Sequence, residues 1–204
     1  MIGEAVIGQA CRALAEWQSA GIDLQSVAVN VSLPQVNAEY FVERTLALIE
    51  ASALTPERLE IEIDEHLLVK PNPVLLTQLK ALAEAGVGLA VDGFGTTYGT
   101  LAGIQRLPIR RIKVGRSLVM HSHDDPLVHR QLKSTTAVAH ALRCSCVAVG
   151  VETEVQLERL RQLGFTHAQG FLLAKPVAVD AVPGLCRHYA DDQTRFSAAP
   201  SETE

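Results

Sequence analysis

The sequence is poor in aromatic residues, which occupy only 4% of its 204 positions. A core built from it must therefore rely on leucine, valine, isoleucine and alanine. Hydrophobic residues as a whole still reach 48% and charged residues 20%, which is the balance of an ordinary globular protein. The length fits a single domain with enough chain to bury a sizeable core.

Cysteine is also scarce, and the four present are Cys11, Cys144, Cys146 and Cys186. No pair has CxxC spacing, so we exclude a disulfide scaffold and expect buried, reduced thiols in a cytoplasmic protein. The chain does not open with a basic region followed by an apolar segment, so we expect no signal peptide. No apolar run approaches the roughly 20 residues of a membrane span.

An excess of positive charge is missing too. The formal net charge is -5 and the isoelectric point is near 5.8, which argues against a broad face for a nucleic-acid polymer. This balance still allows a small anionic ligand held by a few local basic groups.

What the chain does contain is an alternation of short strand patterns and longer helical patterns. We expect helices over 4–20, 38–51, 73–85, 98–106, 126–142 and 154–163, and strands over 27–31, 59–63, 87–91, 111–114, 146–150 and 166–169. Repeated βα units predict a parallel sheet covered by helices. A closed (β/α) TIM-type barrel needs eight strands, and the first pattern is already a helix. The expected α/β fold is thus such a barrel, modified or incomplete at its N-terminus, over residues 1–187. Residues 188–204 are polar and are predicted to form a flexible tail.

Polar or small side chains recur on one face of the predicted strands, opposite branched apolar ones. This face carries Ala28, Asn30, Glu60, Glu62, Gly88, Ala90, Asp92, Arg111 and Lys113. We expect it to point into the barrel. Asn30, Glu62, Asp92 and Lys113 lie near the ends of four strands, where catalytic groups collect in parallel barrels, and can meet around one ion. A hydrolase with two metals needs a second carboxylate beside Asp92, but the neighbour is Gly93.

Several motifs in order resemble the EAL family of cyclic-di-GMP phosphodiesterases, which are (β/α) barrels. The similar runs are Asn30-Val31-Ser32, Leu59 to Glu65, Asp92 to Leu101, Leu107 to Lys113, Gly150 to Thr153, Gln169 to Leu172 and Lys175-Pro176. The resemblance extends over roughly residues 1–180. Several independent motifs in the right order are more specific than any one of them.

The resemblance implies hydrolysis of one phosphodiester bond by two Mg²⁺ or Mn²⁺ ions, roughly 3.5–4 Å apart. Such ions prefer oxygen ligands. By resemblance, Asn30, Glu62 and Asp92 occupy the metal-ligand positions. Lys113 matches the catalytic lysine that orients the attacking water or the phosphate.

The remaining site positions come from the same resemblance. Glu152, a catalytic position of the family, and Gln169 would complete the site. Gln169, Asp92 and Lys113 would contact the nucleotide. Glu65 matches the glutamate that steadies the glycine-rich loop after Asp92, which also shapes the dimer interface of the family.

This chain departs from the family at positions that carry charge. The strand with the Glu-Ala-Leu motif, a further metal ligand and a nucleotide-gripping arginine has no counterpart in it. Gly93 replaces the second aspartate of Asp-Asp-Phe-Gly, and Val149 replaces a site glutamate. Gly115 replaces an aspartate, while Thr97 and Gly99 alter the loop. Losing such ligands removes the charge that holds two divalent ions, so we expect no efficient hydrolysis.

Simpler interpretations of the same residues remain open. Glu62 and Asp92 can be structural, paired with Lys113 or Arg111 inside the barrel. Asn30, Glu152 and Gln169 can be polar residues bonded to backbone at strand ends and loops. The run from His121 to Asp125 is interpreted as a solvated loop before a helix rather than as a metal motif.

The expected role is a cyclic-di-GMP signalling domain without catalysis, acting by nucleotide sensing or protein contact. Weak residual phosphodiesterase activity with Mg²⁺ or Mn²⁺ is one alternative, and a pure protein-interaction module that binds no nucleotide is another. A homodimer through the loop and helix after Asp92, or another protein partner, is expected to cover the open strand edges.

Overall fold

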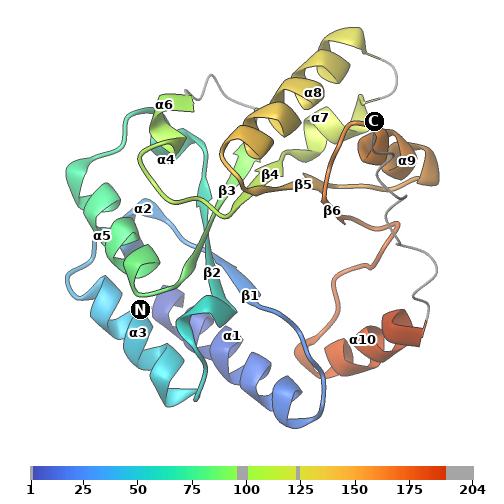
Figure 1. The fold of residues 1–204 in the computed structure, drawn as a ribbon. Helices are drawn as coiled ribbons and strands as arrows, with labels where there is room; N and C mark the ends of the chain where they lie inside the picture. Colours follow the sequence, from blue (N-terminus) through green and yellow to red (C-terminus); the bar gives the residue numbers. More distant parts are fainter. Residues whose placement is uncertain (1, 96–100, 123–124, 192–204) are drawn as a thin grey trace.

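The fold is a curled sheet of six parallel strands with helices packed on its outer side (Figure 1). A computed structural model describes residues 2–95, 101–122 and 125–191. Each strand pairs in parallel with the next one along the chain. The strands are β1 (Val27–Asn30), β2 (Leu59–Asp64), β3 (Gly88–Phe94), β4 (Arg111–Val114), β5 (Ser145–Val149) and β6 (His167–Gln169). The sheet forms a half-barrel, which confirms the prediction of an incomplete (β/α) barrel.

Ten helices were identified in the described residues. The long ones are α1 (Ile2–Ser19), α3 (Phe41–Ala51), α5 (Pro73–Glu84), α8 (Pro126–Ala141), α9 (Glu154–Gln162) and α10 (Val182–Asp191). The short ones are α2 (Leu33–Val36), α4 (His66–Val69), α6 (Leu101–Ile104) and α7 (Arg116–Met120), with 3₁₀ turns at Pro56–Arg58 and Val179–Ala181. None of the described helices combines the length and apolar character needed to cross a membrane.

Three of the long helices begin at side chains that bond their first turn. The Oδ1 atom of Asn72 accepts from the backbone N–H of Leu75 at 2.6 Å, and the Oδ1 atom of Asp125 accepts from Leu127 at 2.8 Å. Each cap is followed by a proline, whose fixed φ suits the first helical position. Thr153 caps α9 in a capping box with Gln156. Each cap contributes about 1 kcal/mol and fixes where its helix starts.

The short helices α2, α4 and α7 follow strand ends and were not predicted, because single turns carry too little periodicity to detect in a sequence. The segment from residue 188 was expected to be a tail, but α10 continues to Asp191. Its half-buried residues Val182, Leu185, Cys186 and Tyr189 have helical spacing. Residues 192–204 lie outside the described part, so the domain boundary at 187 stays a prediction.

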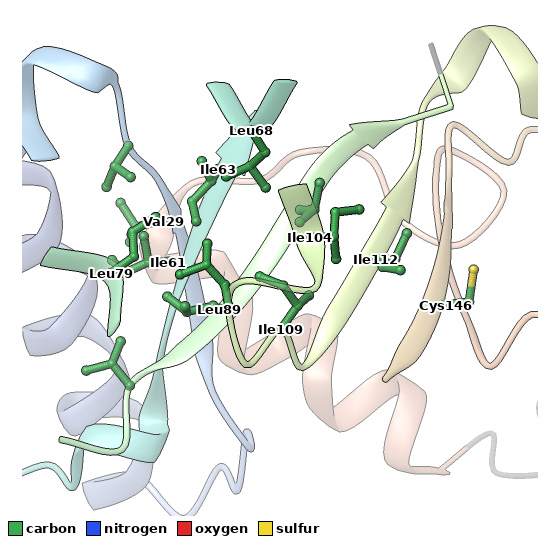
Figure 2. Packing of buried hydrophobic residues seen from close by; sticks show 14 of the residues in the cluster. Val29, Ile61, Ile63, Leu68, Leu79, Leu89, Ile104, Ile109, Ile112 and Cys146 are labelled. Atoms are coloured by element: carbon green, nitrogen blue, oxygen red, sulfur yellow. The ribbon is translucent and has the colours of Figure 1, made fainter. Parts of the chain in front are cut away.

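The core lies between the outer face of the sheet and the helices. Branched side chains on neighbouring strands stand in register, as Ile61 does with Leu89, and Val91 with Ile112. Figure 2 shows Ile61 and Leu89 close to Leu79 of α5, and all five side chains belong to one buried cluster. These five side chains are fully buried, and each burial stabilises the fold by about 1.5–3 kcal/mol. The core therefore fixes which strand face is left for the inside of the half-barrel.

Both ends of the sheet are open among the described residues, since β1 pairs only with β2, and β6 only with β5. The inward-facing residues of these edge strands are exposed: Ala28 and Asn30 on β1, and His167 and Gln169 on β6. On the middle strands, in contrast, the inward-facing residues Glu60, Glu62 and Lys113 are buried.

Candidate functional site

An ion pair crosses the inner face of the half-barrel from β2 to β4. The Nζ atom of Lys113 donates to Oε1 and Oε2 of Glu62, both at 2.6 Å. Both residues are buried, with exposed fractions of 8% for Lys113 and 5% for Glu62. Charge-assisted bonds of this length in a buried place are strong, and each charge compensates the other. Both oxygens of Glu62 are thus engaged by a cation that belongs to the chain.

A second pair lies one step nearer the amino ends of the strands. The Nε atom of Arg111 is 3.3 Å from Oε2 of Glu60, and this buried Nε has no hydrogen-bond partner among the described residues. Burial raises the pKa of Glu60, and the nearby Arg111 charge offsets only part of that rise. Partial burial of the ring, and next the nearby charge of Arg111, lower the pKa of His167 on β6.

The two pairs can form because β3 carries small residues between β2 and β4. Gly88 is in register with Glu60, and Ala90 with Glu62 and Arg111. Neighbouring strands lie about 4.8 Å apart, so glutamate and lysine or arginine side chains two strands apart can meet above a short residue. A sequence of small residues on β3 therefore allows the charge pairing on its neighbours.

Asp92 lies near the end of β3, where the backbone becomes irregular. Its Oδ1 atom accepts from the N–H of Gly93 at 2.9 Å, and the β3–β4 register shifts between Val91 and Phe94. Gly93 has a positive φ of 69°, a conformation that costs glycine little. Asp64, in register with Asp92, is a further carboxylate at this end, and its Oδ1 atom accepts from the N–H of His66 at 3.0 Å.

The other predicted site residues lie at the same carboxyl end of the sheet. Asn30 is in register with Glu62 on the inner face, and Val149 with Gln169. The carbonyl of Gln169 accepts from the N–H of Gly150 at 2.7 Å, which links the ends of β5 and β6. Within the described part of the chain, Glu152 makes no hydrogen bond with Lys113. It forms an ion pair with Arg116 instead.

Glu65 is almost fully buried, with 2% of its surface exposed, and its N–H donates to the carbonyl of Asp92 at 2.9 Å. It thus ties the segment after β2 to the end of β3. The loop that it is predicted to steady, with Thr97 and Gly99, lies outside the described residues. Its role there, and dimerisation through that loop, stay predictions.

Arg116, the first residue of α7, is the site residue that the sequence analysis missed. Its Nη2 atom donates to Oε1 of Glu152 at 2.5 Å across 36 residues of sequence. Its side chain also packs against the backbone of Gly150, which has a φ of 87°. The signal in the sequence was a basic residue, Arg116, shortly after the predicted strand 111–114. A carboxylate, Glu152, stands at the corresponding place after the next predicted strand, 146–150.

These residues do not fit a centre for two divalent ions. Of the metal-ligand positions, Glu62 is paired with Lys113 through both oxygens, Asp92 is bonded to its neighbour's N–H, and Asn30 supplies only a neutral amide. In the described part of the chain, no group of three or more histidine, cysteine, aspartate or glutamate side chains could hold a metal ion. Val149 and Gly93 add no oxygen ligand from their side chains.

A cavity of about 390 Å³ lies away from this site, between α9 and β6, with apolar lining from Leu157, Leu160, Phe165 and Leu173. Apart from His167, it contains none of the polar inward-facing residues described above. The candidate site is therefore the polar inner face and its carboxyl end, because the charged groups converge there.

The comparisons with known proteins agree with this geometry. The chain is 34% identical over 198 residues to the cyclic di-GMP phosphodiesterase NbdA of Pseudomonas aeruginosa, covering 96% of this chain and 24% of that protein. The structure of the PaMucR phosphodiesterase in complex with c-di-GMP is 32% identical, with a TM-score of 0.84, covering 89% of this chain and 73% of that one. A manganese and c-di-GMP complex of BlrP1 from Klebsiella pneumoniae is 28% identical, with a TM-score of 0.75, covering 83% and 42%.

The chain spans about a quarter of the length of the curated relatives that it matches. The sequence model of the EAL domain family matches residues 1–176 of this chain, which is most of its length. The order of the parallel strands and the motifs at their carboxyl ends agree with that match. This chain belongs to the EAL domain family, the phosphodiesterase-like domains of c-di-GMP signalling.

Proposed function

We propose that this chain is a c-di-GMP-binding signalling domain that does not hydrolyse the nucleotide. The observation that carries the proposal is the bidentate pair between Lys113 and Glu62. In a metal-dependent phosphodiesterase, a glutamate at this position must offer its oxygens to a divalent ion. Here the oxygens already have a cationic partner, and the positions of Gly93 and Val149 supply no replacement.

Binding without hydrolysis is chemically consistent with the rest of the site. Hydrolysis of a phosphodiester requires an activated water, and two-metal sites lower the pKa of that water. Recognition of a nucleotide requires only donors for its phosphates and bases. The exposed residues Asn30, Gln169 and Arg116 supply such donors at the carboxyl end of the sheet, where the ligands of parallel sheets bind.

The test is calorimetric titration of c-di-GMP into the purified chain, in separate samples with chelator, Mg²⁺ and Mn²⁺. Each sample is then analysed for linear dinucleotide by chromatography. We expect saturable binding in all three conditions and no product. Product formed only with Mn²⁺ would support a weak phosphodiesterase instead.

A second role, protein contact, is favoured by the open edges of the half-barrel. β1 and β6 leave one strand edge each without a partner in the described part of the chain, and exposed edges pair readily with other strands. Light scattering of the chain at several concentrations measures association between copies. A chain that neither binds c-di-GMP nor releases product would be a pure interaction module.

A further inference from the structure

One cation at the carboxyl end of the sheet is placed to meet an anion. The ammonium of Lys113 is committed to Glu62 and buried. The side chain of Arg116, in contrast, is 57% exposed. Among the described residues, its guanidinium makes a single hydrogen bond, from Nη2 to Glu152, which leaves its other N–H donors available to a ligand.

The stem of Arg116 is held in place by a glycine. A Cβ atom added to Gly150 would lie 2.4 Å from Cγ of Arg116, closer than real atoms approach. Gly150 also has a φ of 87°, in the region that favours glycine. The arginine therefore crosses the backbone where only glycine leaves room. A side chain that is already ordered loses less entropy when it binds a ligand.

The guanidinium lies beside Glu152, in the segment that follows β5 at the carboxyl end of the sheet, where a ligand of a parallel sheet is expected. Gly150 directly follows β5 and Glu152 comes two residues later, and the N–H of Gly150 donates to the carbonyl of Gln169 at the end of β6. Arg116, Glu152 and Gln169 thus surround the carboxyl ends of two adjacent strands. Val149, in register with Gln169, is apolar, so no carboxylate on the inner face of β5 would repel an anion there.

We propose that Arg116 binds a phosphate group of the nucleotide and that Glu152 is its counter-ion in the free protein. This inference rests on the proposed function, since it assigns a phosphate contact within that site. The planar guanidinium binds two phosphate oxygens with two N–H groups, in the way that it binds a carboxylate. A phosphate oxygen replaces or shares the contact with Glu152, and the stem stays on Gly150.

The test measures the affinity for c-di-GMP of Arg116→Met, Arg116→Lys and Glu152→Gln by calorimetry in the presence of chelator. Arg130→Gln, which removes an exposed charge from the outer helix α8, is the matched control. We expect Arg116→Met to weaken binding about 10- to 100-fold, the usual effect of losing charge-assisted bonds. Arg116→Lys should fall between Met and the wild type, because lysine keeps the charge but not the fork. Glu152→Gln should bind as tightly as the wild type or more tightly.

The outcomes separate the two proposals. Suppose that the wild type binds c-di-GMP and that the affinity of Arg116→Met is within about threefold of the affinity of the wild type or of Arg130→Gln. Arg116 is then not the phosphate contact. If Glu152→Gln weakens binding as much as Arg116→Met, Glu152 is a ligand contact and not a counter-ion. If the wild type itself does not bind, nucleotide sensing is wrong, and the assignment of Arg116 falls with it. Circular dichroism of each variant shows whether it remains folded.

Discussion

The Nζ atom of Lys113 on β4 donates to both carboxylate oxygens of Glu62 on β2 at 2.6 Å, across β3, where the residue in register with Glu62 is the small Ala90. This ion pair affects both the stability of the half-barrel and the chemistry that Glu62 can perform. A buried carboxylate is costly unless a cation compensates it, and a lysine compensates it permanently. The same pairing places a cation of the chain at both oxygens of the carboxylate that the family resemblance assigns to a metal.

Removing one partner of this pair should destabilise the fold strongly. We expect Lys113→Met to lower the free energy of unfolding by about 3–5 kcal/mol, because the buried Glu62 is left uncompensated. Urea unfolding followed by circular dichroism measures it. The double variant Lys113→Met/Glu62→Leu should recover most of the loss, since both charges are then gone. A double variant no more stable than the single one would show that the pair acts through packing instead.

The pH dependence of stability should contain a contribution from Glu60. Burial raises its pKa above the ordinary value of 4.5, so the folded state holds this proton more tightly than the unfolded state does. The contribution of Glu60 to stability is therefore full below pH 4.5 and declines as pH rises through its folded pKa. Urea unfolding between pH 4 and pH 7 should show the stability of wild type relative to Glu60→Gln falling with pH. A difference that rises with pH would contradict the raised pKa.

The sequence predicted the six strands, their order and which face turns inward, because alternation of period two is strong in strands such as Leu59–Asp64. It also placed Glu62 and Lys113 near strand ends. Which of these groups meet depends on the register of three strands relative to one another. The pattern of a single strand does not contain that register. For this reason the sequence left open whether Glu62 holds a metal or Lys113. Arg116 was missed because its partner is 36 residues away.

Buried thiols should resist labelling in the folded protein. Cys146 is 2% exposed, and burial raises its pKa to about 12, so very little of it is thiolate at pH 8. Cys11 is fully buried, and burial raises its pKa as well. We expect iodoacetamide to modify Cys186 first, located by peptide mass spectrometry, and all four cysteines once urea unfolds the chain. Early labelling of Cys146 would contradict the burial of β5.

Returning a carboxylate to β5 should restore some affinity for divalent ions. Val149 faces inward beside Gln169, so Val149→Glu adds oxygen ligands near Lys113, whose register partner is Val147. We expect binding of Mn²⁺, measured by calorimetry, to strengthen about tenfold or more, as changes in a metal site commonly do. Val149→Gln is the matched control, with the same length and no charge. Equal affinities in the two variants would show that charge on β5 does not limit metal binding.

Gly150 should be intolerant of a side chain for two separable reasons. Its φ of 87° strains any residue with a Cβ, and the Cβ would clash with Cγ of Arg116. We expect Gly150→Ala to lower the free energy of unfolding by about 1–3 kcal/mol. In an Arg116→Ala background the clash is absent and only the backbone strain remains, so the same change should cost less by at least about 0.5 kcal/mol. Urea unfolding of the four proteins in this cycle measures the coupling. A coupling of zero would mean that the arginine stem moves away from Gly150 without loss, and that its position at the end of β5 is not held by the glycine.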